Sequence, residues 1–267
     1  MLKSYLKDRL KEKEILLMTH IVLGYPSLED SLKIIQIMVD SGVDLIEMQI
    51  PFSEPIADGP VILNANQQAI ASGITVRQCL DFSRKVTRLY NIPFLFMTYY
   101  NILYKYGVEH FTREMAACGL QGAIVPDLPP EEADQYIHCM KQDQLAPIYI
   151  FSPNTPTERM RYISNYADGF IYCVARKGVT GKETAFSGTL EQYLHRCRSA
   201  TSLPLALGFG VKDKTDIDFL KGKADIAVIG SQVLRIIDRD GIEAVGQFIR
   251  GILDVKQLHQ SYRTAPT

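Results

Sequence analysis

The sequence predicts an α/β fold, a single (β/α)8 TIM barrel with an extra helix at its N-terminus. Short apolar runs alternate with stretches of helical spacing, and eight such pairs recur at intervals of about 30 residues. The runs are nearly all apolar, as in parallel strands that are buried on both faces. An open doubly wound sheet also fits the alternation, but eight even units favour closure. Because no linker interrupts them, we expect one domain over residues 1–267, with residues 256–267 as a frayed tail.

Each predicted strand is a short apolar run that ends at glycine, proline or a polar turn. The strands are expected at residues 15–23, 43–50, 93–97, 122–125, 146–151, 169–175, 203–207 and 225–229. The predicted helices carry apolar side chains three and four positions apart, the spacing of one helix face. They are expected at residues 2–13, 27–42, 64–71, 76–90, 108–118, 130–142, 157–165, 188–198, 213–221 and 231–255. Ser27 and Asp30 resemble an N-cap at the start of the second helix.

Composition favours an ordinary globular protein and excludes several classes of function. Hydrophobic residues make up 46% of the chain and its formal net charge is -1, which argues against nucleic-acid binding, since that relies on positive charge. Five scattered cysteines include no CxxC pair, so we expect neither a disulfide framework nor a metal site. No apolar run reaches the ~18 residues of a membrane span, and the N-terminus lacks the apolar core of a signal peptide. We therefore expect a cytoplasmic protein with no membrane contact.

Two carboxylates within residues 44–60 are the first candidates for catalysis. Glu47 lies inside an apolar strand, where burying an unpaired carboxylate costs several kcal/mol. It shares a strand face with Gln49, while the opposite face is purely apolar, so Glu47 is predicted to point into the barrel. Asp58 follows in the loop above the strand end, where such barrels carry their chemistry. The two form a plausible acid/base pair, although a lone buried glutamate is more often a structural ion-pair partner.

Further polar side chains follow other predicted strands. Tyr99, Asp127 and Tyr172 lie at or near strand ends, and each taken singly is more often structural. Asp127, between two prolines, is expected to order its loop. His20, near the end of the first strand, is in position to line the pocket, but the sequence suggests no partner for it.

Glycines at three strand ends predict a phosphate site. They lie at residues 178–181, 208–210 and 230–231, after the sixth, seventh and eighth strands. The loops after strands seven and eight, with a helix N-terminus, form the recurrent phosphate site of this fold. Backbone N–H groups and the helix dipole supply the positive potential there, so no basic patch is required.

The run from Glu47 to Pro60 resembles the strand-two signature of the tryptophan synthase alpha subunit family. The resemblance continues at residues 24–26, 99–101, 126–129, 176–181, 208–210 and 228–231, and covers the chain to about Val255. It implies cleavage of indole-3-glycerol phosphate to indole and glyceraldehyde 3-phosphate, an aldol-type lyase reaction in tryptophan biosynthesis.

The resemblance also implies roles for single residues. Glu47 would be the catalytic acid/base, Asp58 would accept the indole N–H, and Tyr172 would assist beside Glu47. The other assignments are an indole pocket of His20, Ile62, Met97, Tyr99 and Phe209, a phosphate site of Gly181, Gly210, Gly230 and Ser231, and Thr180 for loop closure.

A partner is implied as well. The family pairs with a beta subunit that carries pyridoxal phosphate, in an α2β2 heterotetramer, and no cofactor is implied in this chain. The family's contact surfaces are the loop after the second strand and the segment around Asn101.

Several residues depart from the family pattern. Gln49 stands where glycine is usual, His20 where an aromatic residue is usual, and Tyr25 and Glu54 where aspartate is usual. We expect Gln49 either to narrow the pocket or to hydrogen-bond Glu47. These departures leave two alternatives open: a ligand-binding regulatory subunit with reduced turnover that activates a beta partner, and a stand-alone indole-3-glycerol phosphate lyase.

Overall fold

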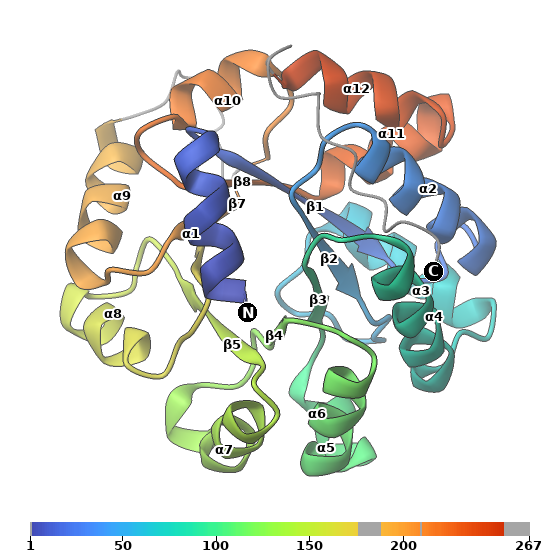
Figure 1. The fold of residues 1–267 in the computed structure, drawn as a ribbon, viewed down its shortest axis with the longest axis horizontal. Coiled ribbons are helices and arrows are strands. Elements are labelled where there is room, and N and C mark those ends of the chain that lie inside the picture. The colour runs from blue at the N-terminus through green and yellow to red at the C-terminus, as the bar shows by residue number, and fades with distance from the viewer. Residues whose placement is uncertain (1, 176–187, 209, 254–267) are drawn as a thin grey trace.

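Eight parallel strands form a closed barrel in which each strand is hydrogen-bonded to the strands before and after it in the chain. The computed structural model describes residues 2–175, 188–208 and 210–253. Helices surround the strands on the outside (Figure 1). The predicted (β/α)8 barrel is therefore confirmed.

The strands fall where the apolar runs predict them. They are β1 (Leu16–Val22), β2 (Leu45–Gln49), β3 (Phe94–Met97), β4 (Gly122–Ile124), β5 (Ala146–Phe151), β6 (Ile171–Val174), β7 (Leu205–Gly208) and β8 (Ile226–Ile229). Most are shorter than the predicted runs, because apolar residues continue beyond the hydrogen-bonded ladder at either end.

The helices of the described residues form the outer layer. They are α1 (Leu2–Glu12), α2 (Leu28–Asp40), α3 (Pro60–Ala71), α4 (Val76–Leu89), α5 (Tyr100–Tyr106), α6 (Val108–Ala117), the 3-10 helix η1 (Pro130–Glu132), α7 (Asp134–Gln142), α8 (Thr157–Ser164), α9 (Gly188–Ala200), α10 (Lys214–Leu220), α11 (Ser231–Asp240) and α12 (Ala244–Ile252). The Oγ of Ser27 accepts the backbone N–H of Asp30, which confirms the predicted cap of α2. Within these ranges, no helix combines the length and the apolar character that a bilayer span requires.

The helices differ from the predictions in several places. Helix α3 begins at Pro60, before the predicted residue 64, and the predicted helix at residues 130–142 is η1 followed by α7. Helix α5 was not predicted from the sequence. The last predicted helix, residues 231–255, is two helices, because Gly241 adopts a φ of 83° that ends α11. The predicted tail, residues 256–267, lies outside the described residues.

Strand β2 separates two apolar cores. Leu45 belongs to the core inside the barrel, whereas Ile46 and Met48 belong to the core between the strands and the helices. Glu47 and Gln49 share the face of Leu45, so they point into the barrel, as the alternation predicts.

Helix α1 is the predicted extra helix, and it closes the N-terminal end of the barrel by lying across the strands (Figure 1). Leu2 and Leu6 pack into the interior core. Beneath the helix, the fully buried Asp44 accepts hydrogen bonds from Arg9 at 2.9 Å and from Lys13 at 2.8 Å. Helix α1 is thus held in place both by apolar packing and by buried ion pairs.

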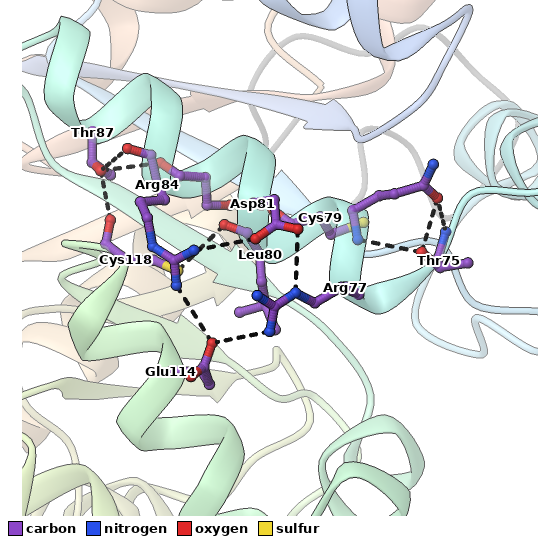
Figure 2. Close-up of polar contacts among 11 residues, drawn as sticks. Thr75, Arg77, Cys79, Leu80, Asp81, Arg84, Thr87, Glu114 and Cys118 are labelled. Carbon is purple, nitrogen blue, oxygen red and sulfur yellow. Dashed lines mark hydrogen bonds and ion pairs between the residues drawn. The ribbon is translucent and has the colours of Figure 1, made fainter.

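Helices α4 and α6 are joined at the surface by a small ion-pair network. Figure 2 shows Glu114 of α6 between Arg77 and Arg84 of α4, at N···O distances of 3.7 and 3.5 Å. Asp81 pairs with both arginines. Because Arg77 and Asp81 are largely solvated and Arg84 and Glu114 stay partly exposed, these pairs add little to stability, and the apolar core beneath provides most of the packing.

Candidate active site

A pocket opens at the carboxyl ends of the strands, where barrels of this kind carry their chemistry. It is lined by His20, Glu47, Ala57, Asp58, Ile62, Met97, Ile124, Pro126, Ile150, Tyr172, Val174 and Gly230. Most of this wall is apolar, and its ionisable side chains are His20, Glu47, Asp58 and Tyr172. A few polar groups converging in an apolar pocket are typical of a small-molecule site.

Glu47 is held deep in the pocket by a histidine from the neighbouring strand. Strands β1 and β2 pair in a register that places His20 opposite Glu47. The Nδ1 of His20 lies 3.1 Å from Oε1 of Glu47, and both residues are 3% exposed. The sequence suggested no partner for His20, and the structure corrects this. The second carboxylate oxygen, Oε2, is buried and has no hydrogen-bond partner among the described residues.

Asp58 reaches the pocket from the loop after β2. Its Oδ2 accepts hydrogen bonds from Nε2 of Gln49 at 2.7 Å and from the hydroxyl of Tyr99 at 3.1 Å. Burial raises the pKa of Asp58, although the nearby His20 and the two hydrogen bonds oppose this. Gln49 therefore bonds to Asp58, not to Glu47 as one of the two expectations for it had proposed.

Tyr172 points into the pocket from β6, on the face opposite the neighbouring buried Cys173. Burial raises the pKa of Tyr172 well above its ordinary value, and the charges of Glu47 and Asp58 add to this. Its ring fits because residue 208 is glycine: a Cβ there would lie 3.0 Å from the ring. The hydroxyl is thus kept protonated beside the two acids.

Tyr99 lies elsewhere than predicted. It was expected to line the indole pocket, but its side chain is fully buried behind Asp58 and is not part of the pocket lining. Its ring stacks on Phe52 at a centroid distance of 4.9 Å, and its hydroxyl accepts the N–H of Ala57. The reason is that Tyr99 follows the end of β3, where its ring reaches under the β2 loop and supports Asp58.

The predicted phosphate residues are partly described. Gly230 lines the pocket and directly precedes α11, whose first residue is Ser231. The free N–H groups of a helix N-terminus favour anions. Gly210, after β7, has a φ of 76°, a conformation that favours glycine. Thr180, Gly181 and Phe209 lie outside the described residues.

Some wall residues were not predicted. They are Ala57, Ile124, Pro126, Ile150 and Val174. Three of them were accessible to sequence reasoning, because Ile124, Ile150 and Val174 lie near strand ends on the inward face, two residues from Gly122, Ile148 and Tyr172. The remainder depend on loop paths that periodicity does not specify.

Two loop residues singled out in the sequence make contacts outside the pocket. Asp127 orders its surroundings as expected, since its carboxylate accepts the backbone N–H of Tyr100 at the start of α5. Tyr25, one of the departures from the family pattern, hydrogen-bonds Asp238 of α11. Burial and that carboxylate raise the pKa of Tyr25 to about 12. This tyrosine therefore ties the loop after β1 to α11 and is not part of the pocket wall.

The fold and the pocket together define an enzyme of the (β/α)8-barrel class that places two carboxylates beside a glycine-led helix N-terminus. In the described part of the chain, no group of three or more His, Cys, Asp or Glu side chains is arranged to hold a metal ion. The family model for the tryptophan synthase alpha chain matches residues 6–262. The chain belongs to this family.

Individual relatives agree with the family match. The tryptophan synthase alpha chain of Syntrophotalea carbinolica is 61% identical over 252 residues, which cover 94% of this chain and all of the relative. The solved structure of tryptophan synthase subunit alpha from Legionella pneumophila superposes with a TM-score of 0.86 at 29% identity, covering 94% of this chain and 96% of that one. A tryptophan synthase complex from Pyrococcus furiosus gives a TM-score of 0.82 at 28% identity, with coverage of 89% and 97%.

Proposed function

We propose that the chain cleaves indole-3-glycerol phosphate to indole and glyceraldehyde 3-phosphate, the lyase step of tryptophan biosynthesis. The observation that carries this proposal is the convergence of Glu47 and Asp58 in one apolar-walled pocket. The pocket thus offers an apolar seat for an aromatic ring, two acids for proton chemistry, and Gly230 with α11 for a phosphate.

The reaction transfers one proton from the glycerol hydroxyl to the ring carbon that bears the side chain. Glu47 in its acid form protonates that carbon, and the resulting carboxylate takes the hydroxyl proton as the C–C bond breaks and the aldehyde forms. Glu47 is therefore in its acid form again at the end of the reaction, and the enzyme has neither gained nor lost a proton. Oε2 of Glu47, buried and without a partner among the described residues, is the oxygen we assign to the substrate.

Asp58 stabilises the charge that develops on the ring. When the ring carbon is protonated, the ring becomes cationic and its N–H a stronger donor, which a fixed carboxylate stabilises. Both described hydrogen bonds to Asp58 go to Oδ2, so Oδ1 is the oxygen that we assign to the ring N–H. We assign to Tyr172, protonated beside both acids, the donation of its O–H to the substrate or to Glu47.

The remaining binding roles follow from position and from the family pattern. We assign the indole ring to the wall formed by Ile62 and Met97, with His20 beside it and Phe209 completing the enclosure. We assign the phosphate to the amides at Gly181, Gly210, Gly230 and Ser231, with Thr180 contacting Asp58 when the loops close and exclude water.

We further propose that the chain works in the cytoplasm with a tryptophan synthase beta subunit, in an α2β2 assembly. Two large apolar side chains support a docking face on the predicted contact surfaces. Ile56, in the loop after β2, is 81% exposed, and Tyr104, on α5, is 71% exposed. Pyridoxal phosphate would belong to the partner, and this chain would use none.

Indole release from indole-3-glycerol phosphate by the purified chain, with and without the beta subunit of the same organism, tests the function. We expect turnover that the partner stimulates. Equal turnover in both conditions would favour a stand-alone lyase. No turnover in either condition would contradict the lyase function and favour a ligand-binding regulatory subunit.

A further inference from the structure

Two side chains that depart from the family pattern lie between the two acids. His20 projects from β1 opposite Glu47, and Gln49 follows Glu47 by two residues on the same inward face of β2. His20 contacts Glu47 through Nδ1 at 3.1 Å, and Gln49 donates to Asp58 through Nε2 at 2.7 Å. Each departure is therefore attached to one acid.

The free ends of these two side chains are complementary. Nε2 of His20 and Oε1 of Gln49 are both buried, and neither has a hydrogen-bond partner among the described residues. A ring nitrogen can donate and an amide oxygen can accept. The side chains are close enough for Gln49 to raise the pKa of His20. A hydrogen bond between these two free ends would complete a path from Glu47 through His20 and Gln49 to Asp58, of which the structure contains the two outer links.

The charges around His20 favour its protonated form. Burial alone would lower the pKa of His20, but Glu47, Asp58 and Gln49 more than offset this and raise it above the ordinary 6.5. Tyr172 faces the same pocket from β6. The other close neighbours, Gly230 before α11 and Ile62 on α3, carry no charge. His20 is therefore more protonated at neutral pH than a free histidine.

We propose that His20 and Gln49 are positioning residues that join Glu47 and Asp58 into one hydrogen-bonded unit, in which His20 and Glu47 share a proton and Gln49 fixes the carboxylate of Asp58. The shared proton lies on His20 beside ionised Glu47, or on Glu47 beside neutral His20. The pair binds the same number of protons in both forms. The second form delivers the proton to the ring carbon, and the hydroxyl proton then replaces it. Two coupled groups of this kind titrate as a pair.

A titration of the His20 imidazole by NMR tests the shared proton without requiring activity. The chain has five histidines, and His20→Phe identifies the His20 signal by its loss. We expect the wild-type signal to titrate above pH 6.5, and Glu47→Gln to move it below 6.5, because burial remains while the carboxylate is gone. Gln49→Gly should lower it by a smaller amount. His195, exposed on α9, provides an internal reference. A His20 titration unchanged by Glu47→Gln would overturn the proposal.

The stability of the folded chain should depend on pH through the protonation of His20. Because the folded chain binds the His20 proton more tightly than the unfolded chain, the pair stabilises the barrel below about pH 6.5. This contribution is lost as the pH rises through the folded-state pKa of His20.

Kinetics test whether the unit serves the reaction, and this arm rests on the lyase function proposed above. His20→Phe and Gln49→Gly install residue types usual in the family, so folding should persist. We expect each to lower kcat about tenfold, with little change in KM. A tenfold loss is the effect of moving the pKa of the proton-transferring group by one unit from the value that the reaction uses. In His20→Phe the basic limb of the pH profile should move to lower pH, because the site no longer retains the histidine's proton.

The double variant His20→Phe/Gln49→Gly provides the matched control. If the two residues act as one unit, the double variant should lose no more activity than the worse single variant. Superimposable pH profiles for wild type and His20→Phe, or strictly multiplicative losses, would overturn the proposal. Lack of cleavage by the wild type would instead contradict the proposed function. The NMR titration would still decide whether His20 and Glu47 share a proton.

Discussion

Glu47→Gln is expected to lower kcat for indole release by about 10²–10⁴-fold, the range that loss of a general acid/base produces. The amide has nearly the same shape as the carboxylate, but it can neither deliver a proton to the ring carbon nor take one from the hydroxyl. Binding should change little, because the ring and the phosphate are held elsewhere. Steady-state indole release and calorimetry with a non-cleavable indole phosphate would measure the two effects.

Glu29→Gln is a suitable control for this substitution. Glu29 lies on α2 and pairs with Lys33 at the surface, where its side chain is 80% exposed. The same chemical change there should leave both kcat and ligand affinity unaltered. Full activity in Glu47→Gln would show that another group moves the proton.

Asp44→Ala is expected to destabilise the barrel by about 3–5 kcal/mol, the cost of removing one member of a buried ion pair. Asp44 is fully buried and accepts hydrogen bonds from Arg9, Lys13 and the backbone N–H of Leu17 at 2.8–3.0 Å. Without the carboxylate, the buried Lys13 loses its hydrogen-bonded anion, and Arg9 of α1 loses one of its acidic partners while it keeps Glu12. Helix α1, which closes the N-terminal end of the barrel, should therefore be held less tightly.

The midpoint of urea unfolding, followed by circular dichroism, measures this effect. Asp8→Ala on the same helix removes a carboxylate that pairs with Lys11 at the surface, and it should leave the midpoint unchanged. An Asp44→Ala midpoint equal to that of the wild type would mean that α1 is held by apolar packing alone. The active site lies at the opposite end of the barrel, so residual folded protein should retain its KM.

The barrel and the orientation of Glu47 were predictable because they depend on local periodicity. Apolar runs alternating with helical spacing identify the units, and the two-residue period of a strand decides which side Glu47 faces. The one-residue step from Ile46 to Glu47 separates an outer core from the pocket. Such information is contained in a few neighbouring residues.

Features that depend on contacts between distant segments were not predictable. Helix α5 has no capping side chain from its own segment at its start. Asp127, from the loop after the next strand, accepts the N–H of Tyr100 instead, so the start of the helix depends on a distant residue. The position of Tyr99 depends on the path of the β2 loop. The partner of His20 required the register between β1 and β2, which no single segment of sequence contains.

The catalytic assignments are most directly tested by a crystal structure of the chain with a non-cleavable indole phosphate that lacks the reacting hydroxyl. The proposed function predicts the ring between Ile62 and Met97, its N–H on Asp58, and Glu47 at the ring carbon that bears the side chain. The phosphate should lie on the amides at Gly230 and Ser231. A ring bound away from Glu47, or a phosphate bound away from the start of α11, would contradict the proposed catalytic site.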